Sequence, residues 1–541
     1  MKIRIVLLLD SLIVPAWTWE AIFQVYQEKN AEIVLAVINT KPIPSGSESP
    51  FLYRVYRFLD RKLFLTQPDA FAKKDLREIS NWKVPQFSVS PIQKKYSDYI
   101  KSEDLEKISK YQPDLILRFG FRILRGEILT LPKLGVWSYH HGDINNYRGG
   151  PPCFWEVFHK AETTGVVLQQ LNEKLDAGLV LYHSRLQTDP LSVQRNANKV
   201  FWTSAPFIAR VIRKISVLGL ENWKDTLNDI QPSNSTKSSI FTPPKTFKML
   251  SIWAKLWARN SVRKIKDPFQ KPHWELTYSE IKPANTLPEK FHALKISQEC
   301  QKKGSYRADP FPVTFHGETW VFYEEFDGKS QKGKIGVGRW EGQKLKDCRT
   351  VLEEPWHLSY PFIWEENGCI YLIPESGEAK ATYLYRAIKF PYQWENLGVF
   401  FPEEGYDPTI LKKDGKYWLL INQKSHPGAS PFVELFAYYS NSLENPTWIS
   451  HALNPIVSDV CASRPAGRIF EKNGKLFRPA QDSGRRYGHR IRIQEIIQLT
   501  ESAYQEKIVG IINPDENTGV LGTHTLNFTD FWVFSDNFYR K

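Results

Sequence analysis

A short proline-containing signature recurs four times in the C-terminal half of the chain, and it limits the fold more than any other feature. In each copy a residue and a proline precede a turn glycine, which is followed by an aromatic-rich strand. The four pairs are Asp309-Pro310, Tyr360-Pro361, Asp407-Pro408 and Arg464-Pro465, whose prolines lie 51, 47 and 57 residues apart. Four-stranded propeller blades repeat with a similar period, about 40–50 residues.

A weaker fifth copy lies near Gly522–Val533. One four-stranded sheet cannot bury both of its faces, whereas sheets stacked around an axis cover one another and leave few free edges. We therefore predict an all-β domain over residues 272–541 with the fold of a five-bladed β-propeller.

The first 215 residues show a different pattern, in which short apolar runs alternate with helical stretches. The runs are Ile3–Leu9, Ile33–Val37, Leu115–Leu117, Val136–Tyr139, Val166–Leu171 and Leu179–His183. Such runs, separated by helices, indicate a parallel sheet that is covered on both faces. No G-x-G-x-x-G follows the first run, so the dinucleotide fingerprint is missing. We predict a multi-domain chain, with an α/β domain over 1–215 before the all-β domain.

Residues 216–271 are predicted to form a linker that contains a basic amphipathic helix. The stretch Gln231–Pro244 is rich in Pro, Ser, Asn and Thr, as linkers are. The stretch 246–265 combines Phe, Leu and Trp with Lys and Arg at helical spacing. A helix of this kind either docks its aromatic side on a neighbouring domain or lies on an anionic membrane surface. We favour docking over peripheral membrane contact.

The charge and the cysteine content limit which classes of partner and which cellular compartment are expected. The net charge is +13, but no block of Lys and Arg resembles a nucleic-acid arm, so no nucleic-acid partner is expected. The five cysteines are scattered without a C-x-x-C pair, which argues against disulfides and zinc and favours a reducing compartment. Near the start, the uninterrupted apolar run Ile5–Leu9 is only five residues long before Asp10 ends it, short of the roughly 7–15 residues of a signal-peptide core. We predict a cytoplasmic protein that binds no metal.

Four polar motifs follow one another in the second half of the α/β domain. They are Trp137-Ser138-Tyr139-His140-His141-Gly142-Asp143, Tyr147-Arg148-Gly149, Thr164-Gly165-Val166 and Leu175-Asp176-Ala177-Gly178. A histidine just past the end of a strand lies where open α/β sheets bind their ligands.

This series resembles the catalytic domain shared by methionyl-tRNA, glycinamide ribonucleotide and sugar N-formyltransferases. When the chain is aligned on Tyr147-Arg148-Gly149, the histidine of the family falls on His140 and its aspartate on Asp176. The resemblance covers roughly residues 1–215 and implies a Rossmann-like fold. It also implies that 10-formyltetrahydrofolate is the formyl donor. The segment implied to hold the pterin of this donor comprises Phe119, Gly120, Phe121, Ile123 and Leu124.

The residue types suit formyl transfer to an amine. The amine attacks the formyl carbon, a tetrahedral oxyanion forms, and the amine loses a proton. An imidazolium at His140 can donate a hydrogen bond to the oxyanion, and Asp176 can help to carry the proton away.

The sequence departs from the family pattern beside this pair. The catalytic asparagine of the family falls on Ser138, whose hydroxyl still donates a hydrogen bond but has a shorter reach. Asn145 or Asn146 in the next loop is an alternative donor. His141 is the rival of His140, which we prefer because it keeps the family's distance to Arg148.

The repeats of the C-terminal domain resemble five-bladed glycosidases of the arabinanase and xylosidase type. They also resemble the propeller-like domain of plant glucosamine inositolphosphorylceramide transferase. The resemblance implies that Asp309 and Asp407 are acidic site residues, while the position of the glycosidase proton donor holds Ser463. Hydrolysis requires a proton donor opposite the base, and Glu375 is a candidate for a relocated acid. The alternative is structural, because Asp-Pro pairs also favour turns and the two aspartates could serve only as caps.

Two classes of function follow. The first is a folate-dependent formyltransferase that acts on a small amine, such as an amino sugar, with a propeller that binds a glycan. The alternative is a carbohydrate-binding or glycan-processing protein whose formyltransferase domain is degenerate. The choice of acceptor rests on the pairing of domains, which is an analogy.

Overall fold

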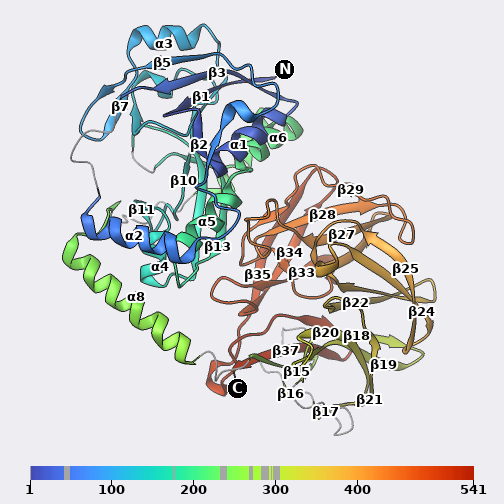
Figure 1. Ribbon diagram of the computed structural model, residues 1–541. Coiled ribbons are helices and arrows are strands. Elements are labelled where there is room, and N and C mark those ends of the chain that lie inside the picture. The colour runs from blue at the N-terminus through green and yellow to red at the C-terminus, as the bar shows by residue number, and fades with distance from the viewer. Residues whose placement is uncertain are drawn as a thin grey trace. The chain divides into compact units, whose positions relative to one another are not determined.

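Two compact units make up the computed structural model of the protein (Figure 1). The structure describes residues 2–41, 49–174, 177–231, 240–266, 272–281, 292–293, 295–296 and 305–540. The first unit contains Met1–Val262 and Ser425–Ser430, and the second contains Arg263–Lys424 and Pro431–Lys541. Among the described residues, no helix has both the length and the apolar content that a membrane crossing needs.

The main sheet of the first unit has the strand order β13-β12-β10-β8-β1-β3-β5. Its strands are β1 (Ile3–Leu9), β3 (Ala31–Asn39), β5 (Gln86–Val89), β8 (Leu115–Arg118), β10 (Val136–His140), β12 (Thr163–Gln170) and β13 (Leu179–Gln187). The strands from β5 to β10 in this order are parallel. Ile5–Leu9 of β1 are almost fully buried, as expected for a central strand covered on both faces.

The two strands at the other edge correct the prediction of a wholly parallel sheet. β12 pairs with β10 antiparallel, and β13 pairs with β12 antiparallel. The reason is the short loop between β12 and β13, because a parallel connection needs a crossover of a dozen or more residues.

The helices of the first unit are α1 (Ala16–Gln27), α2 (Phe51–Phe64), α3 (Ser102–Ser109), α4 (Phe154–His159), α5 (Val193–Ser204), α6 (Phe207–Leu218), α7 (Leu220–Asp225) and α8 (Thr246–Lys266). α1, α5 and α6 contact strands of the main sheet and α3 packs on its core, whereas α2, α4 and α8 share a separate apolar cluster. The last helical stretch before the predicted linker is divided into α5 and α6, and Pro206 separates them. Of the predicted linker, 232–239 and 267–271 lie outside the described residues, whereas α7 and most of α8 fall within the first unit.

Smaller strands complete the first unit. They are β2 (Ile13–Pro15), β4 (Lys73–Asp75), β6 (Ile92–Gln93), β7 (Ser97–Tyr99), β9 (Ile123–Arg125), β11 (Arg148–Gly149) and β14 (Ile240–Phe241). β14 pairs in parallel with β11, so a part of the predicted linker adds a strand to the Tyr147-Arg148-Gly149 motif.

The second unit is built from consecutive sheets of mainly antiparallel strands, within the described residues. Their strand orders are β16-β15-β37-β36, β17-β21-β20-β19-β18, β22-β23-β24-β25, β26-β27-β28-β29 and β31-β33-β34-β35, with β30 and β32 added to the last two. The strand-rich character predicted for this part of the chain is confirmed.

The strands of the second unit recur along the chain together with the x-Pro pairs. They are β15 (Pro272–Glu280), β16 (His292–Ala293), β17 (Lys295–Ile296), β18 (Ser305–Phe315), β19 (Glu318–Asp327), β20 (Lys332–Trp340), β21 (Lys344–Leu352), β22 (Ser359–Glu366), β23 (Cys369–Glu375), β24 (Thr382–Lys389), β25 (Gln393–Phe401), β26 (Tyr406–Lys413), β27 (Lys416–Asn422), β28 (Glu434–Ser440), β29 (Ile449–Ser450), β30 (Val457–Ser458), β31 (Arg464–Pro465), β32 (Phe470–Lys472), β33 (Lys475–Asp482), β34 (Arg490–Leu499), β35 (Tyr504–Ile512), β36 (Leu526–Phe528) and β37 (Trp532–Arg540).

Each of the first three x-Pro pairs lies at a β-bulge. Asp309, Tyr360 and Asp407 all have positive φ angles, of 53°, 44° and 52°. The pairing register shifts at the same places, between Ala308 and Phe311 in the first copy. The proline that follows has no N–H to donate to the ladder, so it fits the position where pairing is interrupted. The repeat found in the sequence therefore marks a repeated backbone kink.

Strands from both ends of the second unit share one sheet. β15, near its start, pairs along its whole length with β37, near its end. β18, β22, β26 and β31 are in contact one after the other. Leu526 of β36 donates its N–H to the Ala466 carbonyl just after β31 (2.6 Å), and β36 also contacts β18. The first strands of all these sheets therefore pack around a common centre.

Tyr360 holds three of these strands together at the centre. Its hydroxyl accepts a hydrogen bond from the Gly467 N–H (2.8 Å) and lies 2.9 Å from the Thr409 hydroxyl. The Tyr360 ring is fully buried against Phe311. Burial raises the pKa of this phenol, which therefore stays protonated.

Replacing Tyr360 by Phe should destabilise the second unit. The change leaves the buried Gly467 N–H without its partner, which costs about 1–3 kcal/mol. Urea unfolding followed by tryptophan fluorescence measures the loss. Tyr417→Phe is the matched control, because the Tyr417 hydroxyl is bonded to Glu366 (2.8 Å) on a half-buried strand position. Equal effects of the two changes would contradict the central role of Tyr360.

Candidate functional site

The predicted catalytic loop begins at the carboxyl end of β10, beside the carboxyl end of β8. Ser138 of β10 pairs with Arg118 of β8, and His140 pairs with Val167 of the antiparallel β12. The carboxyl ends of parallel strands are where open sheets bind ligands. The fold therefore places His140 at the edge where the sequence predicts chemistry.

His140 is buried and is held by the next motif along the chain. Its Nε2 lies 3.0 Å from the carbonyl oxygen of Tyr147. A carbonyl oxygen only accepts, so Nε2 carries the proton in this bond. A Cβ placed on Gly142 would lie 3.0 Å from the same Nε2. Glycine at 142 thus leaves room for the imidazole in the tight loop that leads to Tyr147.

The rival histidine has a different environment. The ring of His141 stacks on Phe201 at 3.6 Å between centroids, and its Nε2 lies 3.1 Å from the Ser204 hydroxyl. Burial and the neighbouring His140 lower the pKa of His141 well below its ordinary value. A ring kept neutral within an aromatic cluster suits packing, so the geometry favours His140 as the site histidine.

Ser138 is bound to an arginine that the sequence reasoning missed. The Arg118 guanidinium donates to the Ser138 hydroxyl (2.9 Å) and to the carbonyl oxygens of Phe121 (2.9 Å) and Arg122 (3.0 Å). The position of the family's asparagine is therefore filled by a hydroxyl and guanidinium pair. The sequence signal that could have identified Arg118 is its position, because it is a charged residue directly after the apolar run Leu115–Leu117.

The predicted pterin segment forms a tight turn whose apolar side chains partly belong to the core. A Cβ on Gly120 would lie 2.4 Å from the backbone nitrogen of Asp10, and Phe121 has a φ of 64°. Phe121 and Leu124 pack in the core of the sheet. Phe119 lies beside the ring of Tyr139, and Ile123 is half-buried at the start of β9. Only the backbone of this segment and its half-buried side chains remain for a ligand.

Asp176, the predicted partner of His140, lies outside the described residues, so the pair stays a prediction. The described residues on either side of this position make close contacts. The Asn172 side chain donates to the Ala177 carbonyl (2.6 Å), and a Cβ on Gly178 would lie 2.2 Å from the Gln170 carbonyl oxygen.

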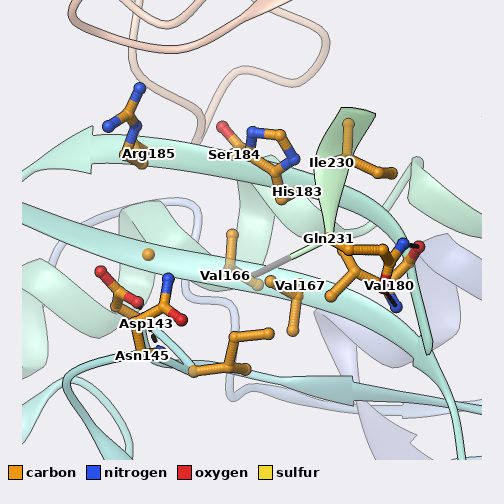
Figure 2. A pocket seen from close by; sticks show the side chains of 12 residues that line it. Asp143, Asn145, Val166, Val167, Val180, His183, Ser184, Arg185, Ile230 and Gln231 are labelled. Atoms are coloured by element: carbon orange, nitrogen blue, oxygen red, sulfur yellow. Dashed lines mark hydrogen bonds between the residues drawn. The ribbon is translucent and has the colours of Figure 1, made fainter. Parts of the chain in front are cut away.

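A pocket of about 290 Å³ lies next to the catalytic loop (Figure 2). Figure 2 shows Asp143 and Asn145 on the loop side of β12, and His183, Ser184 and Arg185 along β13. The full lining is Asp143, Ile144, Asn145, Gly165, Val166, Val167, Val180, His183, Ser184, Arg185, Ile230 and Gln231. The volume approaches the lower end of the range for small-molecule sites, about 300–1,000 Å³.

Glu156 of α4 is a second group that the sequence reasoning missed. Its side chain is 1% exposed, and its Oε1 has no hydrogen-bond partner among the described residues. A Cβ on Gly142 would lie 3.6 Å from this Oε1, on the same side as His140. Burial, with a contribution from Asp143, raises the pKa of Glu156 from 4.5 to about 7. A lone acid in the aromatic stretch Phe154–His159 was the sequence signal.

The second candidate site is a buried group of charges at the centre of the second unit. Asp309, Glu375 and Asp407, all predicted in the sequence, are each less than a tenth exposed. Arg464 binds Asp407 through two nitrogens, one of them 3.1 Å from Oδ1, and lies 3.5 Å from Glu375. The structure therefore brings Glu375 and Asp407 together around one guanidinium. Aromatic rings of Phe432, Tyr487 and Tyr406 surround the same group.

Glu375 is poised for proton exchange. Burial raises its pKa from 4.5 to about 7, and the nearby Asp407 carboxylate adds to the rise. The Ser359 hydroxyl donates to Oε2 of Glu375 (3.0 Å). Ser463, at the glycosidase acid position, donates instead to the Phe432 carbonyl (2.8 Å). Glu375 is therefore better suited than Ser463 to supply a proton.

Asp309 belongs to a cluster with His524 and Asp536, which the sequence reasoning missed. Asp536 accepts from the Asp309 N–H (3.0 Å), and His524 Nδ1 lies 2.7 Å from Asp536. Burial lowers the pKa of His524, but Asp536 and Asp309 more than offset this and raise it. One ligand atom from each of the three residues lies within 4.8 Å of the others, a spacing that can hold a metal ion. His524 and Asp536 pair with each other, while the Asp309 carboxylate accepts from the Thr525 hydroxyl and from the Tyr360 N–H (3.1 Å).

Two sequence families match this chain, each over less than half of its length. The family described as "Formyl transferase" matches residues 62–200. The family described as "Glucosamine inositolphosphorylceramide transferase 1, N-terminal" matches residues 292–520. The resemblance of the first part to formyltransferases and of the second to the inositolphosphorylceramide transferase is therefore confirmed.

Individual relatives agree with this division. Glucosamine inositolphosphorylceramide transferase 1 of Oryza sativa subsp. japonica is 35% identical over 211 residues, which are 38% of this chain and 28% of that protein. Methionyl-tRNA formyltransferase of Lysinibacillus sphaericus (strain C3-41) is 32% identical over 130 residues, 24% of this chain and 37% of that protein. The chain thus spans about a third of the length of these relatives.

A solved structure also aligns with part of the chain. A family 117 glycoside hydrolase of Zobellia galactanivorans aligns at 14% identity and a TM-score of 0.33, covering 50% of this chain and 90% of that one.

Glu156 should make the stability of the first unit depend on pH. Its folded-state pKa of about 7 exceeds the ordinary 4.5, so the folded state binds more protons in this window and loses stability as pH rises through it. At about 1.4 kcal/mol per pKa unit, the loss reaches about 3 kcal/mol. Glu156→Gln lacks this dependence.

Urea unfolding of the protein and of Glu156→Gln, below pH 4.5 and above pH 7, measures the effect. As pH rises, the free energy of unfolding of Glu156→Gln should increase relative to that of the parent protein. Val157→Ala, a neighbouring buried change, should lower stability equally at both pH values. If the free energies of unfolding of the parent protein and Glu156→Gln differed by the same amount at both pH values, the buried carboxyl would not titrate in this window.

Proposed function

We propose that the first unit transfers a formyl group from 10-formyltetrahydrofolate to a small amine, such as an amino sugar, and that the second unit is a five-bladed β-propeller that binds a glycan. The observation that carries the first part is His140 at the carboxyl end of β10, inside the segment that matches the formyl transferase family. A cytoplasmic enzyme is part of this proposal, and the scattered cysteines without a C-x-x-C pair support it.

In this proposal His140 stabilises the transition state. The carbonyl oxygen of the formyl group becomes negative when the amine nitrogen attacks, and an imidazole N–H aimed at that oxygen lowers the barrier. The bond from Nε2–H to the Tyr147 carbonyl fixes the ring before the substrate arrives, so Nδ1–H of the imidazolium is the donor for the oxyanion in this proposal. Asp176 is proposed to take the proton that the amine nitrogen loses.

Arg118 extends the proposal beyond the pattern of the family. Its guanidinium holds the Ser138 hydroxyl, so the position of the missing asparagine carries donors from two side chains. We propose that this pair compensates for the shorter reach of serine. The carbonyl oxygens of Phe121 and Arg122 each accept one bond from Arg118 and keep a second lone pair. They therefore fit the N–H groups of a pterin ring, and the formyl group would arrive on such a donor.

The glycan-binding role of the second unit rests on its central charges and rings. Sugar hydroxyls bind carboxylates and arginine, and the apolar faces of sugar rings pack on aromatic side chains. Glu375, Asp407 and Arg464 offer the first type of contact, while Tyr406 and Tyr487 offer the second. Contact of the first strands around a common centre supports the propeller assignment.

A second candidate function has its own supporting observation. The raised pKa of Glu375, about 7, suits a general acid near neutral pH. With Asp309 or Asp407 as the base, the second unit would process the glycan instead of only binding it. The first unit would then be the degenerate part of the chain.

Formyl transfer should be lost when His140 is replaced. With 10-formyltetrahydrofolate and a panel of amino sugars, release of tetrahydrofolate is followed by absorbance. His140→Ala should lower kcat by about 10²–10³, the usual effect of removing one oxyanion donor. Ile388→Ser, an exposed change in the second unit, is the control and should leave kcat unchanged. A parent protein that binds no folate in calorimetry would rule out the transferase.

Glycan binding should depend on Glu375. Glu375→Gln removes a buried charge that can accept from sugar hydroxyls, so affinity should fall about 10-fold or more, as for hydrogen bonds to charged groups. A glycan array identifies the ligand and titration calorimetry measures its Kd. Glu395→Gln, an exposed change in the same sheet, should have no effect, and neither variant should change formyl transfer. Release of reducing sugar that is lost in Glu375→Gln would support the second candidate.

A further inference from the structure

Helices α2 and α8 cover the same part of the first unit with one face each and leave the other face in water. Their inner side chains share one apolar cluster with α4, in which the rings of Tyr56 and Trp253 meet at 6.4 Å. The cluster also contains Met249, Ile252 and Leu256 of α8. The docking expected for 246–265 therefore accounts for one side of α8 only. Figure 1 shows both helices along the same edge of the first unit.

The outer faces of both helices are unusually apolar. On α8, Phe247, Leu250 and Trp257 are 88%, 48% and 71% exposed, and their spacing of three and seven residues aligns them in one stripe. On α2, Phe58 is 66% exposed, and its offset of two residues from both Tyr56 and Asp60 places it on the opposite side of the helix from these buried side chains. Single exposed apolar residues are normal, whereas several large ones on adjoining helices mark an interaction surface.

Basic side chains flank these apolar residues. Lys62 is exposed on α2, and Lys248 and Lys255 are exposed on α8, where their ammonium groups also lie over the rings of Trp155 and Phe158 of α4. The sequence of α8 contains no acidic residue. The single acidic residue of α2, Asp60, points inward, where it accepts from the Ser192 hydroxyl (2.7 Å) and the Gln194 N–H (2.7 Å). Positive charge is therefore not balanced on the outer faces.

We propose that the outer faces of α2 and α8 bind the surface of an anionic phospholipid membrane. Phe and Trp would enter the boundary between headgroups and acyl chains, where amphipathic helices bury an apolar face and aromatic rings are favoured. Lys and Arg beside them would contact the negative headgroups. This inference does not depend on the proposed formyl transfer or on the proposed glycan binding.

The charges favour a membrane over a second copy of the chain. A symmetric dimer through this surface would bring the same patch of both copies together. Lys248, Lys255 and Lys62 would then face other cations, with no exposed carboxylate on either helix to pair with them. An anionic bilayer supplies the missing negative charge across the whole surface.

Vesicle co-sedimentation of the full chain tests the proposal. The protein should bind vesicles of phosphatidylcholine mixed with phosphatidylglycerol, bind phosphatidylcholine alone far more weakly, and be released by high salt. The double variant Phe247→Ser, Trp257→Ser should lose about 10-fold or more of its partitioning, because two large apolar side chains no longer leave water. Phe58→Ser on α2 should lose part of the binding through a separate element.

Matched controls keep the result interpretable. Phe531 of the second unit is 74% exposed, so Phe531→Ser makes the same type of change elsewhere and should leave vesicle binding intact. All the replaced side chains are exposed, and thermal melting should be unchanged. If the double variant bound vesicles as well as the parent protein, the proposal would be wrong. It would also be wrong if the parent protein bound no vesicles but formed a dimer that the double variant lost.

Discussion

The second unit depends on pairing charges and polar groups that its geometry forces into the centre. The first three x-Pro pairs lie at bulges, and the residue before each of the four prolines is buried. An unpaired charge at such a place is strongly unfavourable. Asp309 is held by Asp536, Thr525 and the Tyr360 N–H, and Asp407 is held by Arg464 and Gln481. The same contacts that satisfy the charges also tie each sheet to its neighbours.

The sequence predicted the parts of this structure that repeat or that have a local cause. The x-Pro pairs marked the strand-rich unit because a proline and a bulge are local features. His524 and Asp536 escaped prediction because they reach Asp309 from more than two hundred residues away, across the pairing of β15 with β37. No periodicity encodes such a contact. The antiparallel edge β12 and β13 was missed for a related reason, since a short apolar run does not state its direction.

In the candidate transferase site, too, sequence patterns did not predict the contacts that single residues make with distant parts of the chain. The position of His140 after β10 followed from a motif and a strand end. Arg118 did not, because its role arises from the parallel register that places it opposite Ser138. Glu156 reaches the loop from α4, and only the folded loop shows that it lies beside Gly142. A motif thus locates a site, but the residues that tune it come from neighbouring elements.

Burial has a common effect in the two candidate sites. Glu156 in the first unit and Glu375 in the second are each brought to a pKa of about 7, mainly because the charged form loses its hydration. Their surroundings differ, however. Glu375 has Arg464 and Ser359 as partners, so its charged form is partly supported. Glu156 has an oxygen without a hydrogen-bond partner in the described structure, so a bound proton or a hydrogen-bond donor would stabilise it. The charged form of a carboxyl group that is left unsatisfied next to His140 is unfavourable for stability, and protonation relieves this cost.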